Sequence, residues 1–287
     1  MAVVLALLAA TAFAAGTVLQ QRGTLSTPAG GEDARFLVQI LREPVWLAGA
    51  SLQAVGWILQ AAALDRGPLV AVQALTALSL VIALPIGVRL TDQHVGRRDV
   101  VAALAVVVGI VAFLTVGAPA GGTTNPSAGE WWAAGLIAVV LVGTIASVGR
   151  VGRGATRAAL FGAAAGVGYA LQAAVTKVFV GELGQGMAHL LATWSTYVLI
   201  VSAIVGFVLQ QSALKTGALA PAMAASNAST LVCSALFGII VFDERLVHGG
   251  GRVAFAIAGL GLAVIGVVWL AASASGTAAT FADHETP

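Results

Sequence analysis

The sequence predicts an all-α polytopic membrane protein with nine transmembrane helices and an inverted-topology repeat. Of its 287 residues, 59% are hydrophobic and 9% are charged, whereas soluble domains carry about 25% charged residues. Nine runs approach the length of about 20 mostly apolar residues that a membrane-spanning helix needs. One stretch of 14 residues recurs with seven identical positions, and an internal repeat of this kind decides the predicted architecture.

The nine predicted spans follow the apolar runs along the chain. They cover residues 2–21, 45–64, 68–90, 99–117, 131–148, 158–180, 188–210, 217–242 and 252–272, which we number spans 1 to 9. Span 1 is kept in the mature protein because it lacks the positively charged start of a signal peptide. After it, the patch Phe36 to Leu41 is too short to cross the bilayer. We predict an interfacial helix there, ending before Pro44.

The repeat joins residues 56–69, GWILQAAALDRGPL, to residues 206–219, GFVLQQSALKTGAL. The offset is 150 residues and seven of fourteen positions are identical, among them Gln60 with Gln210. Spans 1 to 4 then correspond to spans 6 to 9, and span 5 is a linker. Matched spans are five helices apart, so they cross in opposite directions, as in many secondary transporters. The predicted units are a first half (1–117), a linker with span 5 (118–157), a second half (158–272) and a disordered cytoplasmic tail (273–287).

The distribution of positive charge predicts the orientation. The loops after spans 1, 3, 5 and 7 carry ten Lys or Arg residues and the opposite side carries four, which places the first set in the cytoplasm. The amino terminus is then outside and the carboxyl terminus cytoplasmic. Trp131 and Trp132 fall at the outer boundary, and Trp46 and Trp269 at the inner one, where aromatic belts belong. Twelve Arg against two Lys favour a high-GC bacterium, and so a bacterial plasma membrane.

The candidate binding residues are neutral amides. No Asp, Glu, Lys or Arg falls in the central part of a predicted span, although such a residue is the usual mark of an ion path. Gln60, Gln73, Gln172 and Asn227 lie near the predicted interface of the two halves and are the predicted substrate-binding residues. The alternative for each is an interhelical hydrogen bond, worth about 0.6 kcal/mol on average. A transporter should line a central cavity with these amides, while a scaffold should bury them in pairwise contacts.

Other chemistry-bearing residues are sparse. Asp243 and Glu244 lie at the outer membrane boundary and are the candidate metal ligands; the alternative is a solvated loop. The histidines lie near loops without metal-ligand spacing. No nucleotide-binding motif occurs, nor a Ser/His/Asp, Cys/His or paired-carboxylate set at a common depth, so neither an enzyme nor a cofactor is predicted. Cys233, Gly162 and Gly166 are interpreted as packing residues.

Several segments together resemble a known family. They are Phe13 to Gly23 (FAAGTVLQQRG), Leu41 to Gly49 (LREPVWLAG), Leu64 to Leu75, Phe242 to Arg245 (FDER) and Pro221. The chain resembles the drug/metabolite transporter (DMT) superfamily, EamA-related, and within it the NIPA-like branch, whose eukaryotic members are magnesium transporters. The resemblance covers nearly the whole chain, and nine helices with an external amino terminus fit this branch better than the commoner ten-helix members.

Two positions depart from the magnesium-transporting members of the branch. Those members end the first helix in lysines, where this chain has Gln20, Gln21 and Arg22. They also carry a proline early in the third helix, where Val72 or Gln73 stands here. Both departures count against Mg²⁺ as the substrate that the resemblance implies.

The predicted function is secondary transport of a small solute by alternating access, and the resemblance implies Mg²⁺. However, Mg²⁺ is usually held by one or two carboxylates with several waters retained, and the chain offers no carboxylate at mid-membrane. An uncharged or zwitterionic solute needs no buried countercharge, so a small polar metabolite or drug exporter is the first alternative. A non-transporting membrane scaffold subunit is the second. The expected partners are the bilayer and a small-molecule or cation substrate, without nucleic acid; a homodimer is a further option.

Overall fold

The computed structural model describes residues 1–26, 42–90, 96–123, 126–214, 216, 219–246 and 251–282, and nearly all of them are helical. The predicted interfacial helix at Phe36 to Leu41 lies outside the described residues. The long helices are α1 (Ala2–Ser26), α3 (Pro44–Leu64), α4 (Leu69–Thr76), α5 (Ser79–Leu90), α6 (Arg97–Gly117), α7 (Ala128–Val151), α8 (Gly154–Glu182), α10 (Trp194–Leu214), α11 (Leu219–Ile240) and α12 (Gly251–Ala282). Short elements are β1 (Ala120–Gly121), η1 (Leu183–Gln185), α9 (Met187–Ala192) and β2 (Glu244–Arg245).

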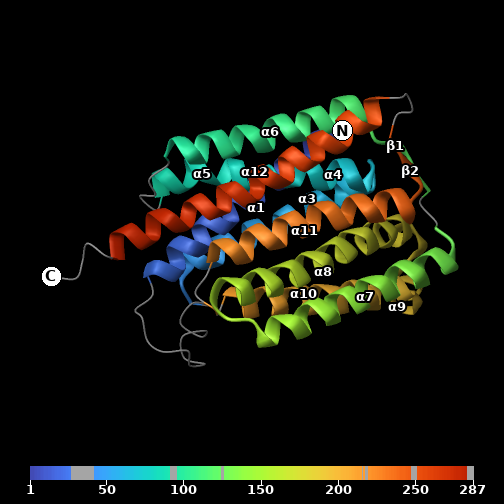
Figure 1. Ribbon diagram of the computed structural model, residues 1–287. Coiled ribbons are helices and arrows are strands. Elements are labelled where there is room, and N and C mark those ends of the chain that lie inside the picture. Colours follow the sequence, from blue (N-terminus) through green and yellow to red (C-terminus); the bar gives the residue numbers. More distant parts are fainter. Residues whose placement is uncertain are drawn as a thin grey trace.

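The helices form one bundle with their axes roughly side by side (Figure 1). At one edge of the bundle α6 packs along α12, and at the other edge α7 and α10 pack on α8, with α1, α3 and α11 between them. The loops after α6 and α11 meet as a two-stranded antiparallel ribbon, in which Ala120 pairs with Arg245 and Gly121 with Glu244. This ribbon ties together the loops that follow two helices far apart in the sequence.

Charge divides the two ends of the bundle. The end with the β-ribbon carries most of the described acidic residues and is called the acidic end: Asp65, Glu130, Glu182, Asp243 and Glu244. The opposite end is called the arginine end, and its described basic residues are Arg22, Arg42, Arg89, Arg97, Arg98, Arg150, Arg153 and Arg157. This is the grouping that the charge count predicted. The cytoplasmic location of the arginine end stays a prediction.

Helices that correspond in the predicted repeat run antiparallel to each other. The start of α4 meets the loop that follows α11, because Glu244 accepts hydrogen bonds from the amides of Leu69 and Val70. Likewise, Gly117 at the end of α6 faces Ala256 near the start of α12, while Val106 faces Gly266. The contacts between both pairs therefore have the direction that an inverted arrangement requires.

Glycine allows the closest helix approaches. A Cβ added to Gly162 or Gly166 on α8 would collide with the carbonyl oxygen of Ala222 or Ser226 on α11. On α1, a Cβ at Gly16 would lie 2.9 Å from the Gly49 carbonyl oxygen of α3. Small residues at such positions let membrane helices pack backbone against backbone, which supports the packing interpretation of the Gly162 and Gly166 pair.

Among the described residues, eight helical segments are long and apolar enough to cross a membrane, with α4 and α5 counted together as Leu69–Leu90. Trp194–Gln210 is a shorter apolar helix. The chain is therefore a polytopic all-α membrane protein. Together these nine segments fall on the nine predicted spans. By length and composition alone, however, the stretch predicted as span 7 does not reach the length of the other eight.

The third predicted span is a broken helix rather than a continuous one. After α4 ends at Thr76, the Leu78 amide bonds to the carbonyl of Leu75, three residues back, before the regular pattern resumes in α5. The Thr76 hydroxyl also donates to the Gln73 carbonyl at 3.0 Å, so it competes for an acceptor of the helix backbone. The predicted span over 68–90 is therefore present as Leu69–Leu90, but its helix is interrupted between Thr76 and Ser79.

Two other boundaries also differ. The seventh span, predicted as 188–210, is divided into α9 and α10 at Thr193, whose backbone is extended. The Glu182 carboxylate explains this division because it accepts hydrogen bonds from the Thr193 and Ser195 hydroxyls at the start of α10. At the carboxyl end, α12 continues to Ala282 through the first part of the predicted disordered tail, since this alanine-rich segment favours helix.

Candidate functional site

Two of the predicted binding residues contact each other. Gln60 on α3 donates from Nε2 to Oε1 of Gln73 on α4 at 3.3 Å, and the Thr76 hydroxyl lies 3.2 Å from the same oxygen. Gln73 and Thr76 are buried. Both glutamines lie four residues from the acidic end of their helices, a depth of about 6 Å. Their contact is pairwise, and it lies toward one membrane boundary rather than at mid-membrane.

The second half contains a matching contact that sequence reasoning did not anticipate. Gln210 on α10 donates from Nε2 to Sδ of Met223 on α11 at 3.2 Å. Both partners lie 150 residues after Gln60 and Gln73. The adjoining turns also match, since the Arg66 amide bonds to the Ala63 carbonyl and the Thr216 amide to the Ala213 carbonyl. The side chain of Gln210 is buried, and its Oε1 has no hydrogen-bond partner among the described residues.

Gln172 and Asn227 do not join Gln60 and Gln73. Gln172 lies ten residues before the acidic end of α8, a depth of about 15 Å, and Asn227 lies thirteen residues before that end of α11, about 20 Å deep. Asn227 donates from Nδ2 to the Met223 carbonyl of its own helix at 2.8 Å. Both are partly buried. The four amides are therefore spread over several depths instead of forming one cluster.

Glu244 is the most heavily bonded side chain near the acidic end. It is 2% exposed, and its carboxylate accepts from the Leu69 amide at 2.5 Å and the Val70 amide at 3.0 Å. These amides are the first of α4, and they have no partners inside the helix. A carboxylate at a helix start also meets the positive end of the helix dipole. Glu244 therefore caps a helix of the first half from a loop of the second half.

Lys177 of α8 neutralises this carboxylate. Its Nζ lies 2.5 Å from Glu244 Oε1, and the two side chains are 8% and 1% exposed. The ammonium also lies 4.7 Å from the centre of the Phe242 ring, close enough for a cation–π interaction. Phe242 packs edge-on against Trp131, and Trp131 lies 5.0 Å from Trp194. An ion pair with an aromatic wall on one side is thus enclosed at the acidic end.

Asp243 and Glu244, the candidate metal ligands, lie in opposite surroundings. The Asp243 side chain is 67% exposed and pairs with Arg245 at 3.0 Å, as a solvated loop residue would. Glu244 is buried because the β-ribbon turns it inward, against Gly238 of α11. Among the described residues, no group of three or more His, Cys, Asp or Glu side chains could hold a metal ion. The two residues therefore do not converge on one ligand site.

Sequence reasoning missed the role of Lys177, although one signal was available. Lys177 falls inside predicted span 6 (158–180), but it was counted with the outer loops. A charged residue inside a span is rare and nearly always has a partner. Applied to Lys177, this rule would have directed attention to the acidic residues at the same boundary, which are Asp65, Glu130, Glu182, Asp243 and Glu244. Which of the five pairs with Lys177 depends on the fold.

Comparisons with known proteins give one relative. The chain is 28% identical over 247 residues to an uncharacterized protein of Corynebacterium glutamicum, an alignment that covers 85% of this chain and 86% of the relative. No protein-family model matches the chain, and no solved structure matches it. The alignment thus extends over most of both sequences, and the name of the relative assigns no activity.

Proposed function

We propose that the chain is a secondary transporter that moves a small solute by alternating access between two inverted halves. The observation that carries the proposal is the repeated contact of Gln60 with Gln73 and of Gln210 with Met223, 150 residues apart. The first contact lies toward the acidic end and the second toward the arginine end. Inverted repeats supply two near-equivalent packings, and exchange between them opens a transporter alternately to each side.

Glu244 supports this proposal because its carboxylate links the two halves at the acidic end. Glu244 and Lys177 belong to the second half, and the amides of Leu69 and Val70 belong to the first. Moving 150 residues back from Glu244 leads to His94. In the first span the match has an offset of 152 residues, pairing Gly16, Leu19 and Gln20 with Gly168, Leu171 and Gln172, so Lys177 corresponds to Leu25. No equivalent carboxylate and lysine occur at those positions. The acidic end therefore has a buried carboxylate that links the halves, and the position that matches it in the repeat is not a carboxylate, as expected of a state closed at the acidic end.

For the substrate we propose a small uncharged or zwitterionic polar solute. The buried carboxylates among the described residues are Glu244 and Asp99. Glu244 is occupied by Lys177 and two amides, and Asp99 accepts from the Gly96 amide at the start of α6. Neither is free to replace the water ligands of Mg²⁺. The amides and hydroxyls in the bundle suit a neutral solute better.

The main test uses two cysteine reporters in a Cys233→Ala background. Ser234→Cys lies one turn below Gly238, which faces Glu244, and Ser234 is 0% exposed. Met223→Cys reports on the opposite end. An impermeant thiol reagent is applied from each side of oriented membrane vesicles. In Glu244→Gln, labelling of the Ser234 position from the acidic side should rise while labelling of the Met223 position from the arginine side falls.

Opposite changes in labelling at the two reporter positions distinguish transport from the alternatives. A scaffold subunit, which the pairwise Gln60 and Gln73 contact also fits, predicts no change at either reporter. Simple unfolding predicts that labelling rises at both. The matched control is Asp243→Asn, which removes the neighbouring exposed carboxylate and should leave both reporters unchanged. Labelling that is unchanged, or that rises at both positions, contradicts the proposal.

The resemblance to the NIPA-like branch makes Mg²⁺ the second candidate substrate. The test is growth of a magnesium-transport-deficient bacterium on limiting Mg²⁺ while it expresses this chain. Rescue that disappears in Asp243→Asn/Glu244→Gln would favour the cation. No rescue, with verified membrane expression, would favour the neutral solute and its assay by uptake and efflux in proteoliposomes.

A further inference from the structure

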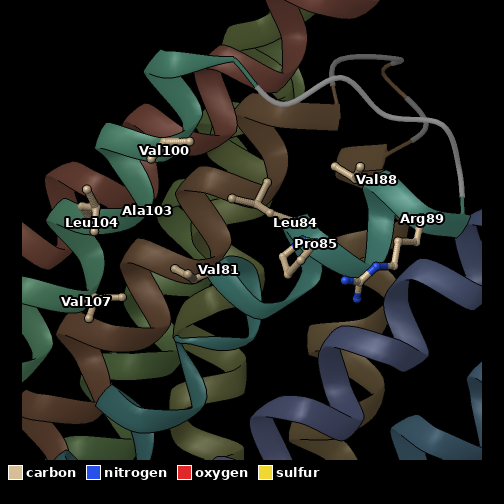
Figure 2. Close-up of a pocket in the computed structure, with 9 residues that line it drawn as sticks. All are labelled: Val81, Leu84, Pro85, Val88, Arg89, Val100, Ala103, Leu104 and Val107. Atoms are coloured by element: carbon tan, nitrogen blue, oxygen red, sulfur yellow. The ribbon is translucent and has the colours of Figure 1, made fainter.

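A lateral groove lies between α5 and α6, far from the ion pair. It has a volume of about 500 Å³ and is lined by Val81, Leu84, Pro85, Val88, Arg89, Val100, Ala103, Leu104 and Val107. Figure 2 shows the α5 and α6 side chains facing one another across it. Arg89 is the one lining residue that carries a charge. The groove is therefore apolar along its length, with the positively charged side chain of Arg89 at one end.

The fold explains why the two helices leave a space. The helix break after Thr76 separates α5 from α4, and α5 then packs on α1 and touches α6 only slightly. Pro85 lies inside α5, where it lacks the amide that would bond to the Val81 carbonyl and so favours a bend. On the other side, α6 is held by its close packing on α12 through Gly109. Neither helix is free to close the groove.

The dimensions of the groove match one leaflet of a bilayer. It extends from Arg89 and Val100 near the arginine end to Val81 and Val107 deeper in the bundle. The nine residues from Val81 to Arg89 extend about 12 Å along a helix. Half of the hydrocarbon thickness of a bilayer is about 15 Å. Leu104 and Val100 are 57% and 48% exposed, so the groove opens sideways toward lipid.

The positive charge near the groove favours a lipid with an anionic headgroup. Arg89 lines the groove, and Arg97 and Arg98 begin α6 within one turn of the lining residue Val100. All three are exposed, and none of them has an ion-pair partner among the described residues. Asp99, close by in the sequence, is buried and accepts from the Gly96 amide. We propose that this groove binds an anionic phospholipid, with one acyl chain between α5 and α6 and its phosphate on Arg89. Basic pockets between membrane helices on the cytoplasmic side bind anionic headgroups in this way.

The test is native mass spectrometry of the purified full-length protein with phosphatidylglycerol or phosphatidylcholine of identical chains. Wild-type protein should retain phosphatidylglycerol preferentially. Arg89→Gln should reduce that retention roughly fivefold without affecting phosphatidylcholine, and Arg89→Lys should restore most of it. The matched control is Arg150→Gln, which removes an exposed arginine at the same end but away from the groove.

A second variant tests the acyl chain. Ala103→Leu fills the groove from the α6 side with apolar atoms, and it should reduce retention of both lipids. Equal retention of the two lipids by wild-type protein overturns the headgroup assignment. Equal effects of Arg89→Gln and Arg150→Gln overturn the site. None of these results depends on transport, so the proposed function can fail while the lipid site stands, and the reverse also holds.

Discussion

Asp243 and Glu244 are neighbours with the same charge and opposite surroundings. The first is exposed beside Arg245, and the second is enclosed by Lys177 and the start of α4. A surface ion pair contributes about 0–1 kcal/mol. Removing one partner of a buried pair costs about 3–5 kcal/mol, because the other charge stays buried without compensation. One step along the chain thus separates a dispensable carboxylate from one that the fold requires.

Glu244→Gln should lower the thermal stability of the purified protein markedly, by the equivalent of about 3 kcal/mol, whereas Asp243→Asn should have almost no effect. The double variant Lys177→Met/Glu244→Gln should recover much of the loss, since no uncompensated charge remains. Thermal unfolding in detergent, followed by size-exclusion chromatography, measures all three variants. Equal melting temperatures for the two single variants would show that the Glu244 ion pair is not formed in the folded protein.

Gln73→Leu and Asn227→Leu should behave differently. Gln73 accepts from Gln60 through its side chain, so its loss leaves the partly buried Gln60 amide without this acceptor and should cost about 1 kcal/mol, while the Thr76 hydroxyl keeps the Gln73 backbone carbonyl. Asn227 bonds through Nδ2 to the backbone of its own helix. We expect its replacement by Leu to leave stability nearly unchanged and to abolish transport. If Asn227→Leu transports an identified substrate at the wild-type rate, Asn227 serves packing rather than substrate binding.

At the scale of elements, packing depends on where helices approach most closely. Gly162 on α8 meets the backbone of α11, while nothing lies within 4 Å of a Cβ built at Gly143 on α7. The two glycines are thus alike in sequence context, inside apolar spans, and different in tertiary contact. The lipid-facing α7 contributes little to the interior. Only 11% of its apolar segment is buried inside the protein, whereas 67% of the apolar segment of α8 is buried. Contact, rather than helix propensity, decides the effect of a substitution.

Gly162→Ala should therefore destabilise the protein by about 1–3 kcal/mol, because a methyl group forces α8 and α11 apart. Gly143→Ala should be neutral or stabilising by up to about 1 kcal/mol, since alanine favours helix over glycine. Melting temperatures of the two variants, measured side by side in the same detergent, decide between these outcomes. A greater loss of stability at Gly143 would contradict the packing of α8 on α11.

At the scale of the whole molecule, charge sets the direction of insertion. Most of the described basic residues lie at the arginine end, and most of the described acidic residues lie at the opposite end. The cytoplasmic side of a membrane protein carries the excess of Lys and Arg in its loops. The amino terminus and the Glu244 ion pair should then face the outside, and the Arg89 groove should open in the cytoplasmic leaflet.

Single cysteines at Ser127 and Arg97, in a Cys233→Ala background, test this orientation. Ser127 precedes α7 at the acidic end and Arg97 begins α6 at the arginine end, and both are exposed. An impermeant thiol reagent added to intact cells should label the Ser127 position and not the Arg97 position. The reverse labelling pattern would mean that the whole bundle is inserted the other way round.

The sequence by itself determined the class of fold, the places of the spans and the grouping of charge, because hydrophobicity and charge act on each segment separately. It also predicted a repeat, since Gln60 and Gln210 match within one short stretch. The tertiary structure alone decided that Lys177 pairs with Glu244, which lies 67 residues away, and that Gln172 and Asn227 lie apart from Gln60 and Gln73. It also revealed the break after Thr76. These features depend on which helix faces which, and at what depth. That is settled by close contacts such as Gly162 against Ala222 and by the β-ribbon that turns Glu244 inward, neither of which leaves a local pattern along the chain.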